Sequence, residues 1–329
     1  MTAVHLCLFN NPLAGVTDQV FFLEAALRNR GFAVSLSDRL RADALNLVIE
    51  NYRPAAEGCN FHEAVGAFCR RFDKRVGVVM TEHIERRGRE ILFDGTPLED
   101  PGYIGNKLSR FFGLLSQSQH AFGFFTLGPL PELETFGDIF LQHDLYRLPF
   151  PALDLPPPRR EEPPARPLRR RSAYDFVFTG AMTPYRADLL AGLNRRFRVL
   201  VSSQVAEPKR AELYGQADVA LNIPQDPSWS WISPMRVMFG LRMGRPTINV
   251  GGSLQRGEFD RAIPMDLEAE AALADPAGLY ARQKEGYLRL AREGERRFPE
   301  QAFRLWAQVE GLDPAGHRTG AASPAAAPR

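Results

Sequence analysis

The second half of the chain holds two stretches whose residue types could bind a phosphate group. The first is the strand-like run 174–180. It ends in Thr179 and Gly180, and Ala181 follows. Glycine lets a ligand approach the backbone closely, and the helix predicted to follow would direct free N–H groups toward that ligand. Arg186 would lie in the first turn of this helix, although an ordinary strand-to-helix turn with an exposed arginine explains the same residues.

The second stretch reads WISPMRVMFG, residues 231–240. Ser233 can cap a helix, and Pro234 suits its first position. Arg236 then falls in the first turn, where a guanidinium and the helix dipole could together hold a diphosphate. A solvent-facing arginine beside an ordinary cap is the simpler interpretation of this stretch.

The loop PQDPSWSW precedes this helix at 224–231. Gln225 and Asp226 could hydrogen-bond a ribose or another sugar. Trp229 and Trp231 could stack on a base or a sugar ring. Aromatic packing within a long loop explains the two tryptophans equally well.

A proton acceptor is predicted where a strand of the first half ends. Glu82 and His83 follow the apolar run 75–81, and open α/β sheets bind ligands at the carboxyl ends of their strands. His83 has an intrinsic pKa suited to a general base, and Glu82 is the second candidate. A histidine in a loop is more often just exposed to solvent.

The first strand-to-helix turn, NNPLAG, is the other candidate of the first half. Asn10, Asn11 and Gly15 could line the side of a cleft opposite the phosphate-binding residues. His5 falls within a predicted strand and His120 near the start of another. Both histidines are therefore interpreted as structural.

The candidate residues must be positioned by the surrounding secondary structure. Strands that alternate with helices along the chain predict a mostly parallel sheet covered by helices on both faces. In the first half, strands are expected at 4–10, 32–37, 44–50, 75–81 and 121–127, and helices at 17–31, 61–74 and 104–119. Residues 82–102 carry many charges and turn residues and are expected to be irregular.

The pattern restarts after residues 154–172, which contain six prolines and six arginines and cannot form a packed element. The second half repeats the plan of the first. Its strands are expected at 174–180, 197–203, 218–224 and 245–250, and its helices at 184–196, 207–216, 233–244, 279–298 and 299–312. Phe298, Phe303 and Trp306 on the last helices are candidates to pack back across the junction of the two halves.

The amino-acid composition indicates which broad class of protein this chain belongs to. The chain has 329 residues with 44% hydrophobic and 24% charged residues, as in an ordinary globular protein of two domains. A net charge of +2 does not argue for a nucleic-acid partner. The start lacks the pattern of a secretory signal, no apolar run reaches membrane-spanning length, and three cysteines form neither a metal motif nor a disulfide framework. A cytoplasmic protein is expected.

Several motifs in order carry a resemblance to a known family. Residues 174–250 contain FVFTGAM, FRVLVSS, GQADVALNI and SPMRVMFGLRMGRPTINV. This succession resembles the C-terminal half of GT-B glycosyltransferases, and looks most like the group called glycosyltransferase family 1 or CgeB-like. The match covers about a quarter of the chain closely.

The resemblance implies an α/β fold of two Rossmann-like domains that face each other across a cleft, the GT-B fold. It also implies transfer of a sugar from a nucleotide-sugar donor, with Arg236 as a phosphate contact and the base, His83 or Glu82, on the N-terminal domain. The expected donor-side residues are Thr179, Gly180, Ala181, Arg186, Gln225, Asp226, Ser233 and Arg236, and the acceptor-side residues are Asn10, Asn11 and Gly15. The expected domains are 1–153, an acceptor-side domain; 154–172, a linker; 173–312, a donor-binding domain; and 313–329, a disordered tail.

No cofactor or metal is expected, because the Asp-x-Asp motif of the other common glycosyltransferase fold is missing. The chain also lacks the acidic residue that often follows the arginine in this family, since Val237 and Met238 come next. That difference favours an inverting reaction. It also leaves open a protein that binds a nucleotide or glycan without catalysis. A two-domain solute-binding protein is a third interpretation.

The partners expected are a nucleotide-sugar donor and an unidentified acceptor, which could be a glycan, a lipid or a protein. No nucleic-acid partner is expected. The arginines of 154–172 offer a contact to anionic lipid at a membrane surface, and a solvated tether is the simpler interpretation.

Overall fold

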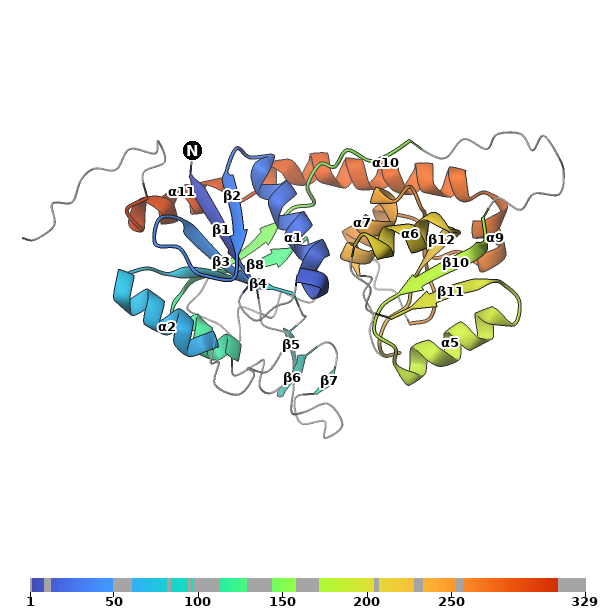
Figure 1. The fold of residues 1–329 in the computed structure, drawn as a ribbon, viewed down its shortest axis with the longest axis horizontal. Coiled ribbons are helices and arrows are strands. Elements are labelled where there is room, and N and C mark those ends of the chain that lie inside the picture. Colours follow the sequence, from blue (N-terminus) through green and yellow to red (C-terminus); the bar gives the residue numbers. More distant parts are fainter. Residues whose placement is uncertain are drawn as a thin grey trace, which may run out of the picture.

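The computed structural model describes residues 2–8, 13–49, 61–81, 84–93, 96–97, 113–128, 144–157, 172–203, 207–227, 233–252 and 257–312. These residues form two units, each built on a parallel β-sheet, that lie side by side (Figure 1). The long helix α10, Pro276–Gly294, runs along both units (Figure 1). No helix of the described part of the chain is long and apolar enough to cross a membrane.

The first unit is a six-stranded sheet with the order β2-β1-β3-β4-β8-β9, and every pair in it is parallel. Its strands are β1 Ala3–Cys7, β2 Ala33–Ser37, β3 Leu45–Ile49, β4 Val76–Met80, β8 Ala121–Leu127 and β9 Leu145–Leu148, and its labelled helices are α1 Leu13–Arg28 and α2 Phe61–Phe72. Every residue of β3 and β4 is buried, as expected for strands covered by helices on both faces.

The second unit is a four-stranded parallel sheet with the order β11-β10-β12-β13. Its strands are β10 Tyr174–Thr179, β11 Val199–Ser202, β12 Ala217–Asn222 and β13 Thr247–Asn249. Its helices are α5 Pro184–Asn194, α6 Lys209–Gly215, α7 Pro234–Arg242, α8 Glu258–Ala262 and α9 Ala269–Ala274. In both sheets the first strand lies between the second and the third, so the strand order reverses there. Open α/β sheets bind ligands at such a reversal.

One hydrophobic core crosses from the first unit to the second. It includes Phe22 of α1, Val237 of α7 and Tyr287 of α10. The segment before the second sheet lies against α10, because the Tyr287 hydroxyl donates to the carbonyl of Pro151 at 2.9 Å and the Tyr280 hydroxyl donates to that of Pro156 at 2.7 Å. The two units therefore share buried side chains, and α10 holds the chain segment that connects them.

The last helices return to the first sheet, as predicted. Helix α11, Glu300–Val309, places Phe303 with its ring 5.3 Å from that of Phe32 and 5.1 Å from that of Phe125. Trp306 stacks on Phe122 at 5.0 Å. Helix α11 thus closes the first unit with residues from the end of the chain.

Two expectations were wrong, and three short elements were missed. Part of 82–102 forms an antiparallel sheet of β5 Ile84–Arg87, β6 Glu90–Phe93 and β7 Thr96–Pro97, in which Gly88, with φ of 64°, makes the first turn. The many charged residues of this segment had favoured an irregular structure over a hairpin. Helix α1 begins at Leu13, four residues earlier than predicted, so Gly15 lies inside a helix and not in a turn. The short elements β9, α8 and α9 were not predicted.

Candidate functional site

The carboxyl ends of β10 and β12 and the helices that follow them form the candidate site. Strand β10 ends at Thr179 and α5 begins at Pro184, while β12 ends at Asn222 and α7 begins at Pro234. Because the strands are parallel, the N-termini of α5 and α7 lie at the same edge of the sheet. Free N–H groups and the positive ends of two helix dipoles favour an anion at this edge.

Thr183 connects the two turns that form this edge. As the N-cap of α5, its hydroxyl oxygen accepts a hydrogen bond from the backbone N–H of Arg186 at 3.3 Å. The same hydroxyl donates to the carbonyl of Gln225 at 2.8 Å. The turn after β10 and the turn after β12 are thereby fixed to each other.

Arg236 extends from the first turn of α7 to the backbone of β10. Its Nη1 donates to the carbonyl of Thr179, and its guanidinium lies 5.1 Å from the ring centre of Phe178. A Cβ atom on Gly180 would lie 3.0 Å from its Nη2 and 3.3 Å from its Nη1. Gly180 therefore leaves the space that the guanidinium occupies.

The charge of Arg236 is not neutralised by a directly bonded carboxylate. None of the ion pairs among the described residues includes it, and its Nε is buried without a hydrogen-bond partner there. Burial lowers the pKa of Arg236; the neighbouring Tyr214 and Asp18 raise this pKa, and the Arg210 cation lowers it. The result is a partly buried cation at a helix N-terminus, which is suited to binding an anion.

Arg186 has a different environment. It is 3% exposed, and its Nε and Nη2 donate to the carbonyl of Ile223 at 3.0 and 2.7 Å. Its Nη1 donates to the carbonyl of Ala181 at 2.7 Å. These bonds occupy the guanidinium with backbone groups, so the geometry supports a positioning role for Arg186 rather than the predicted contact to a ligand.

Asparagines at the ends of two strands extend the site, and the sequence analysis did not single them out. The Asn222 Nδ2 donates to the Asn249 Oδ1 at 2.8 Å, and the Asn249 Nδ2 donates to the carbonyl of Gly251 at 3.0 Å. The hydroxyl of Tyr185 on α5 accepts from the N–H of Gly252 at 2.9 Å. The endings ADVALN and PTIN, each with an asparagine where the strand stops, are the signal that could have found them.

Helix α1 of the first unit lies against α6 and α7 beside this edge. Asp18 forms an ion pair with Arg210 of α6, with Nη1 and Oδ2 2.8 Å apart. The guanidinium of Arg242 lies 3.5 Å from the ring centre of Phe21, and its Nη2 is 3.6 Å from Glu207. The two contacts of α1, Asp18 with Arg210 and Phe21 with Arg242, join residues about 190 or more positions apart, and nothing in the sequence pairs them.

The remaining predicted residues have varied positions. Ser233 is the N-cap of α7, as predicted, but its side chain makes no capping hydrogen bond. Gln225 is partly buried and Asp226 is exposed, both in the turn after β12. Glu82, His83, Asn10, Asn11, Trp229 and Trp231 lie outside the described residues. The part of the chain that the structure describes contains no cluster of His, Cys, Asp and Glu that could hold a metal ion.

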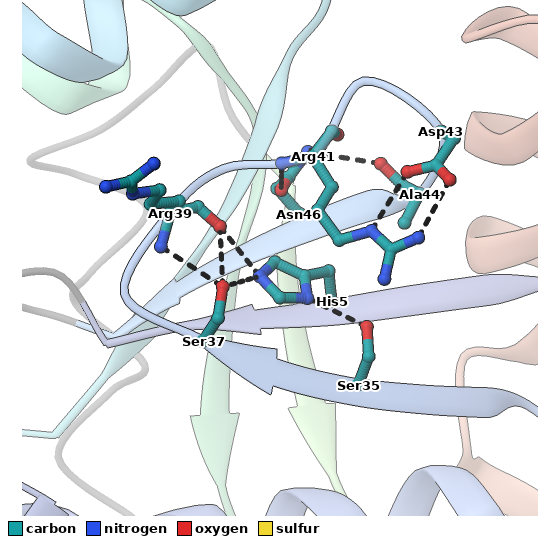
Figure 2. Close-up of polar contacts among 8 residues, drawn as sticks. All are labelled: His5, Ser35, Ser37, Arg39, Arg41, Asp43, Ala44 and Asn46. Atoms are coloured by element: carbon teal, nitrogen blue, oxygen red, sulfur yellow. Dashed lines mark hydrogen bonds and ion pairs between the residues drawn. The ribbon is translucent and has the colours of Figure 1, made fainter.

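His5 lies in a separate polar cluster between β1 and β2 (Figure 2). It is 1% exposed, its Nε2 donates to the carbonyl of Arg39 at 2.8 Å, and its Nδ1 is 2.8 Å from the hydroxyl of Ser35. Burial lowers the pKa of His5 most and Arg41 lowers it further, while the Arg39 carbonyl and Asp43 raise it. A neutral, fully bonded ring agrees with the structural role predicted for His5.

This chain resembles known proteins in its fold and not in its sequence. Neither the profile of a protein family nor the sequence of a curated protein matches this chain. A mutant of phage T4 BGT, solved in complex with UDP-glucose, matches it with a TM-score of 0.50 and 8% identity, over 95% of this chain and 100% of that chain. AviGT4, a glycosyltransferase involved in avilamycin A biosynthesis, aligns with a TM-score of 0.47 and 15% identity, over 94% of this chain and 99% of that one.

The similarity to the phage T4 structure extends over almost the whole chain. It confirms the predicted fold, an α/β protein with two Rossmann-like sheets in the GT-B arrangement. The finer assignment to the glycosyltransferase family 1 or CgeB-like group stays a prediction. At 8% identity the similarity shows the fold alone, so the roles of individual residues depend on the geometry above.

Proposed function

We propose that the protein is a glycosyltransferase that moves a sugar from a nucleotide-sugar donor to an acceptor. The observation that carries the proposal is the position of Arg236, whose guanidinium lies over Gly180 where the N-termini of α5 and α7 meet. The GT-B fold supports it. The acceptor is a glycan, a lipid or a protein.

The chemistry needs an environment that stabilises the nucleoside diphosphate as it leaves. Negative charge grows on the diphosphate in the transition state, so donors fixed around it lower the barrier. Each helix N-terminus contributes about 0.3–1 kcal/mol, and Arg236 adds a charge-assisted hydrogen bond without needing a metal ion. In this proposal the donor contacts Thr179, Gly180, Ala181, Gln225, Asp226, Ser233 and Arg236, and Arg186 positions the turn.

The first unit supplies the acceptor side. His83, or Glu82 as the second candidate, would remove the proton from the acceptor hydroxyl, and both follow β4 in the sequence. Asn10 and Asn11, which follow β1 in the sequence, would line the acceptor side. Because Val237 and Met238 follow Arg236, no carboxylate is placed there for a second displacement. We therefore propose an inverting reaction.

A second candidate function is a protein that binds a nucleotide or glycan without transferring a sugar. The same absence of an acidic residue after Arg236 favours it. Binding alone cannot separate the two functions, because Arg236 and Gly180 would serve both. Turnover separates them.

The first test is a thermal-shift series with UDP, GDP, dTDP, ADP and CMP and the matching nucleotide sugars. The phage T4 protein of the same fold was solved with UDP-glucose, so the uridine compounds come first. A ligand at one hundred times its Kd adds about 2.7 kcal/mol of stability. We expect one nucleotide class to stabilise the wild type and Arg282→Gln, an exposed arginine of α10, but not Arg236→Gln.

A hydrolysis assay with the stabilising nucleotide sugar then tests catalysis. Slow release of the nucleoside diphosphate by the wild type, reduced in His83→Ala, would support transfer. Binding without turnover, with every acceptor class offered, would favour the second candidate. A folded wild type that no nucleotide stabilises would refute the donor site.

A further inference from the structure

We infer that Asp18 of the first unit is an internal counter-ion of the donor site, which holds Arg210 until the diphosphate of the donor replaces it. The inference depends on the proposed function and adds a regulatory contact to the same site. It makes Arg210 a further phosphate-binding residue and places a competing carboxylate on the opposite unit.

The ion pair between Asp18 and Arg210 is well formed and shielded from solvent. Both carboxylate oxygens contact the guanidinium, Nη1 with Oδ2 at 2.8 Å and Nη2 with Oδ1. The side chain of Arg210 is 17% exposed and that of Asp18 is 12% exposed. Solvent screens such a pair less than a surface pair, so it joins α1 to α6 effectively.

Arg210 is a neighbour of Arg236. Its guanidinium lies 3.5 Å from the ring centre of Phe239, and Phe239 follows Arg236 by three positions on α7. Residues three apart share one face of a helix, so the two guanidinium groups lie on the same side of α7. The charges of Arg210 and Asp18 also act on Arg236: the Arg210 cation lowers the pKa of Arg236, and the Asp18 carboxylate raises it.

One carboxylate does not satisfy this pair of arginines. Among the described residues, the Nε atoms of Arg210 and Arg236 are buried and have no hydrogen-bond partner. Buried donors without acceptors are unfavourable, and two guanidinium groups beside a single carboxylate leave a net positive charge. A diphosphate, with more charge and more acceptor oxygens than Asp18, would pair with both arginines.

Asp18 and the ligand would therefore compete for the same cation. A purely structural ion pair makes the opposite prediction, because its removal would loosen the contact between the units and would not strengthen binding. Arg242 and Phe21 provide a separate contact between α1 and α7 that does not include Asp18. Glu207, the carboxylate beside Arg242, offers a matched control at the same contact surface.

The test is calorimetric titration of the full chain with UDP and with inorganic pyrophosphate, at low and at physiological salt. We expect Asp18→Asn to bind UDP about tenfold more tightly than the wild type, and Arg210→Gln to bind it at least tenfold more weakly. Asp18→Glu keeps the charge, and Glu207→Gln removes a carboxylate that pairs with Arg242 and not with Arg210, so both should bind UDP as the wild type does. The gain of Asp18→Asn should be smaller at higher salt.

Unchanged or weaker UDP binding by folded Asp18→Asn would overturn the inference. If Asp18→Asn does not fold, Asp18→Ser with the same titration decides, and Arg210→Gln with undiminished affinity would overturn the inference by itself. A wild type that binds UDP and loses it in Arg236→Gln, with no gain in Asp18→Asn, would refute only the counter-ion. A wild type that binds no nucleoside diphosphate would refute the proposed function and this inference together.

Discussion

At the scale of single residues, Gly180 and Arg236 form one unit of the candidate site. The sequence predicted both, one from its place after a strand and the other from its place after Ser233 and Pro234. It could not predict that the guanidinium would lie where a side chain on Gly180 would be, because 56 residues separate them. The same limit applies to Asp18 and Arg210, whose pairing arises only when the two units meet.

Gly180→Ala should weaken donor binding and also destabilise the fold. The new Cβ would lie 3.0 Å from the Nη2 of Arg236, so the guanidinium would move, and the φ of 157° at this position is one that a residue with a side chain rarely adopts, which costs about 1–3 kcal/mol. Titration with the bound nucleotide and urea denaturation would measure the two effects. Gly192→Ala in exposed α5 is the control, and it should stabilise by about 0.5–1 kcal/mol with unchanged affinity. Equal affinity in both variants would contradict the placement of Arg236.

His5 should make the free energy of unfolding depend on pH. Its pKa is lowered in the folded protein, so between that pKa and about 6.5 the unfolded chain binds the extra proton. The contribution is therefore complete above about pH 6.5 and is lost as the pH falls through the folded pKa. Urea denaturation of the wild type and His5→Gln from pH 5 to 7.5 measures it. A difference between the two proteins that does not change with pH would show that His5 does not titrate there.

At the scale of elements, burial decides which predictions succeeded. Strand β8 was predicted with the bounds it has, because its seven residues are apolar apart from Thr126 and the turn residues Gly128 and Pro129 follow it. The sheet β5–β7 was missed because β5, IERR, has three consecutive charged residues and no alternation of apolar and polar residues. The helices α8 and α9 have only five and six residues, too few to show a helical period.

Two substitutions in helix α11 measure how much its apolar face contributes to the free energy of unfolding. Phe303 is fully buried against Phe32 and Phe125, whereas Leu305 of the same helix is 57% exposed. Phe303→Ala should cost about 3–5 kcal/mol of unfolding free energy, and Leu305→Ala less than about 0.5 kcal/mol. Urea denaturation measures both. Similar losses in the two variants would mean that α11 is not docked on the first sheet.

At the scale of the whole molecule, the chain passes between the units in both directions. It leaves the first sheet along α10 after Leu148 and returns through α10 to α11. The repeated plan of the two halves, visible in the sequence, predicted two sheets. Phe303 and Trp306 were also predicted to pack back across the junction, but the sequence could not predict their partners Phe32, Phe122 and Phe125, which lie far from them along the chain.

The residues 1–157 alone should therefore not reach the native state. Without Phe303 and Trp306, the apolar surface around Phe122 and Phe125 is open to water. We expect this fragment to bind the dye ANS and to lack near-ultraviolet circular dichroism, and adding residues 172–312 should reverse both. A fragment with native circular dichroism and no dye binding would show that α11 is dispensable for the first unit.

The position of α11 also orders events during synthesis. The strands of the first unit are complete at Leu148, yet the helix that covers them ends at Val309, about 160 residues later. At 5–20 residues per second, a ribosome needs roughly 8–30 s for that interval. During this time the apolar face around Phe122 and Phe125 of the nascent first unit is not covered by α11. The first unit therefore cannot bury the apolar face around Phe122 and Phe125 until translation has passed Val309.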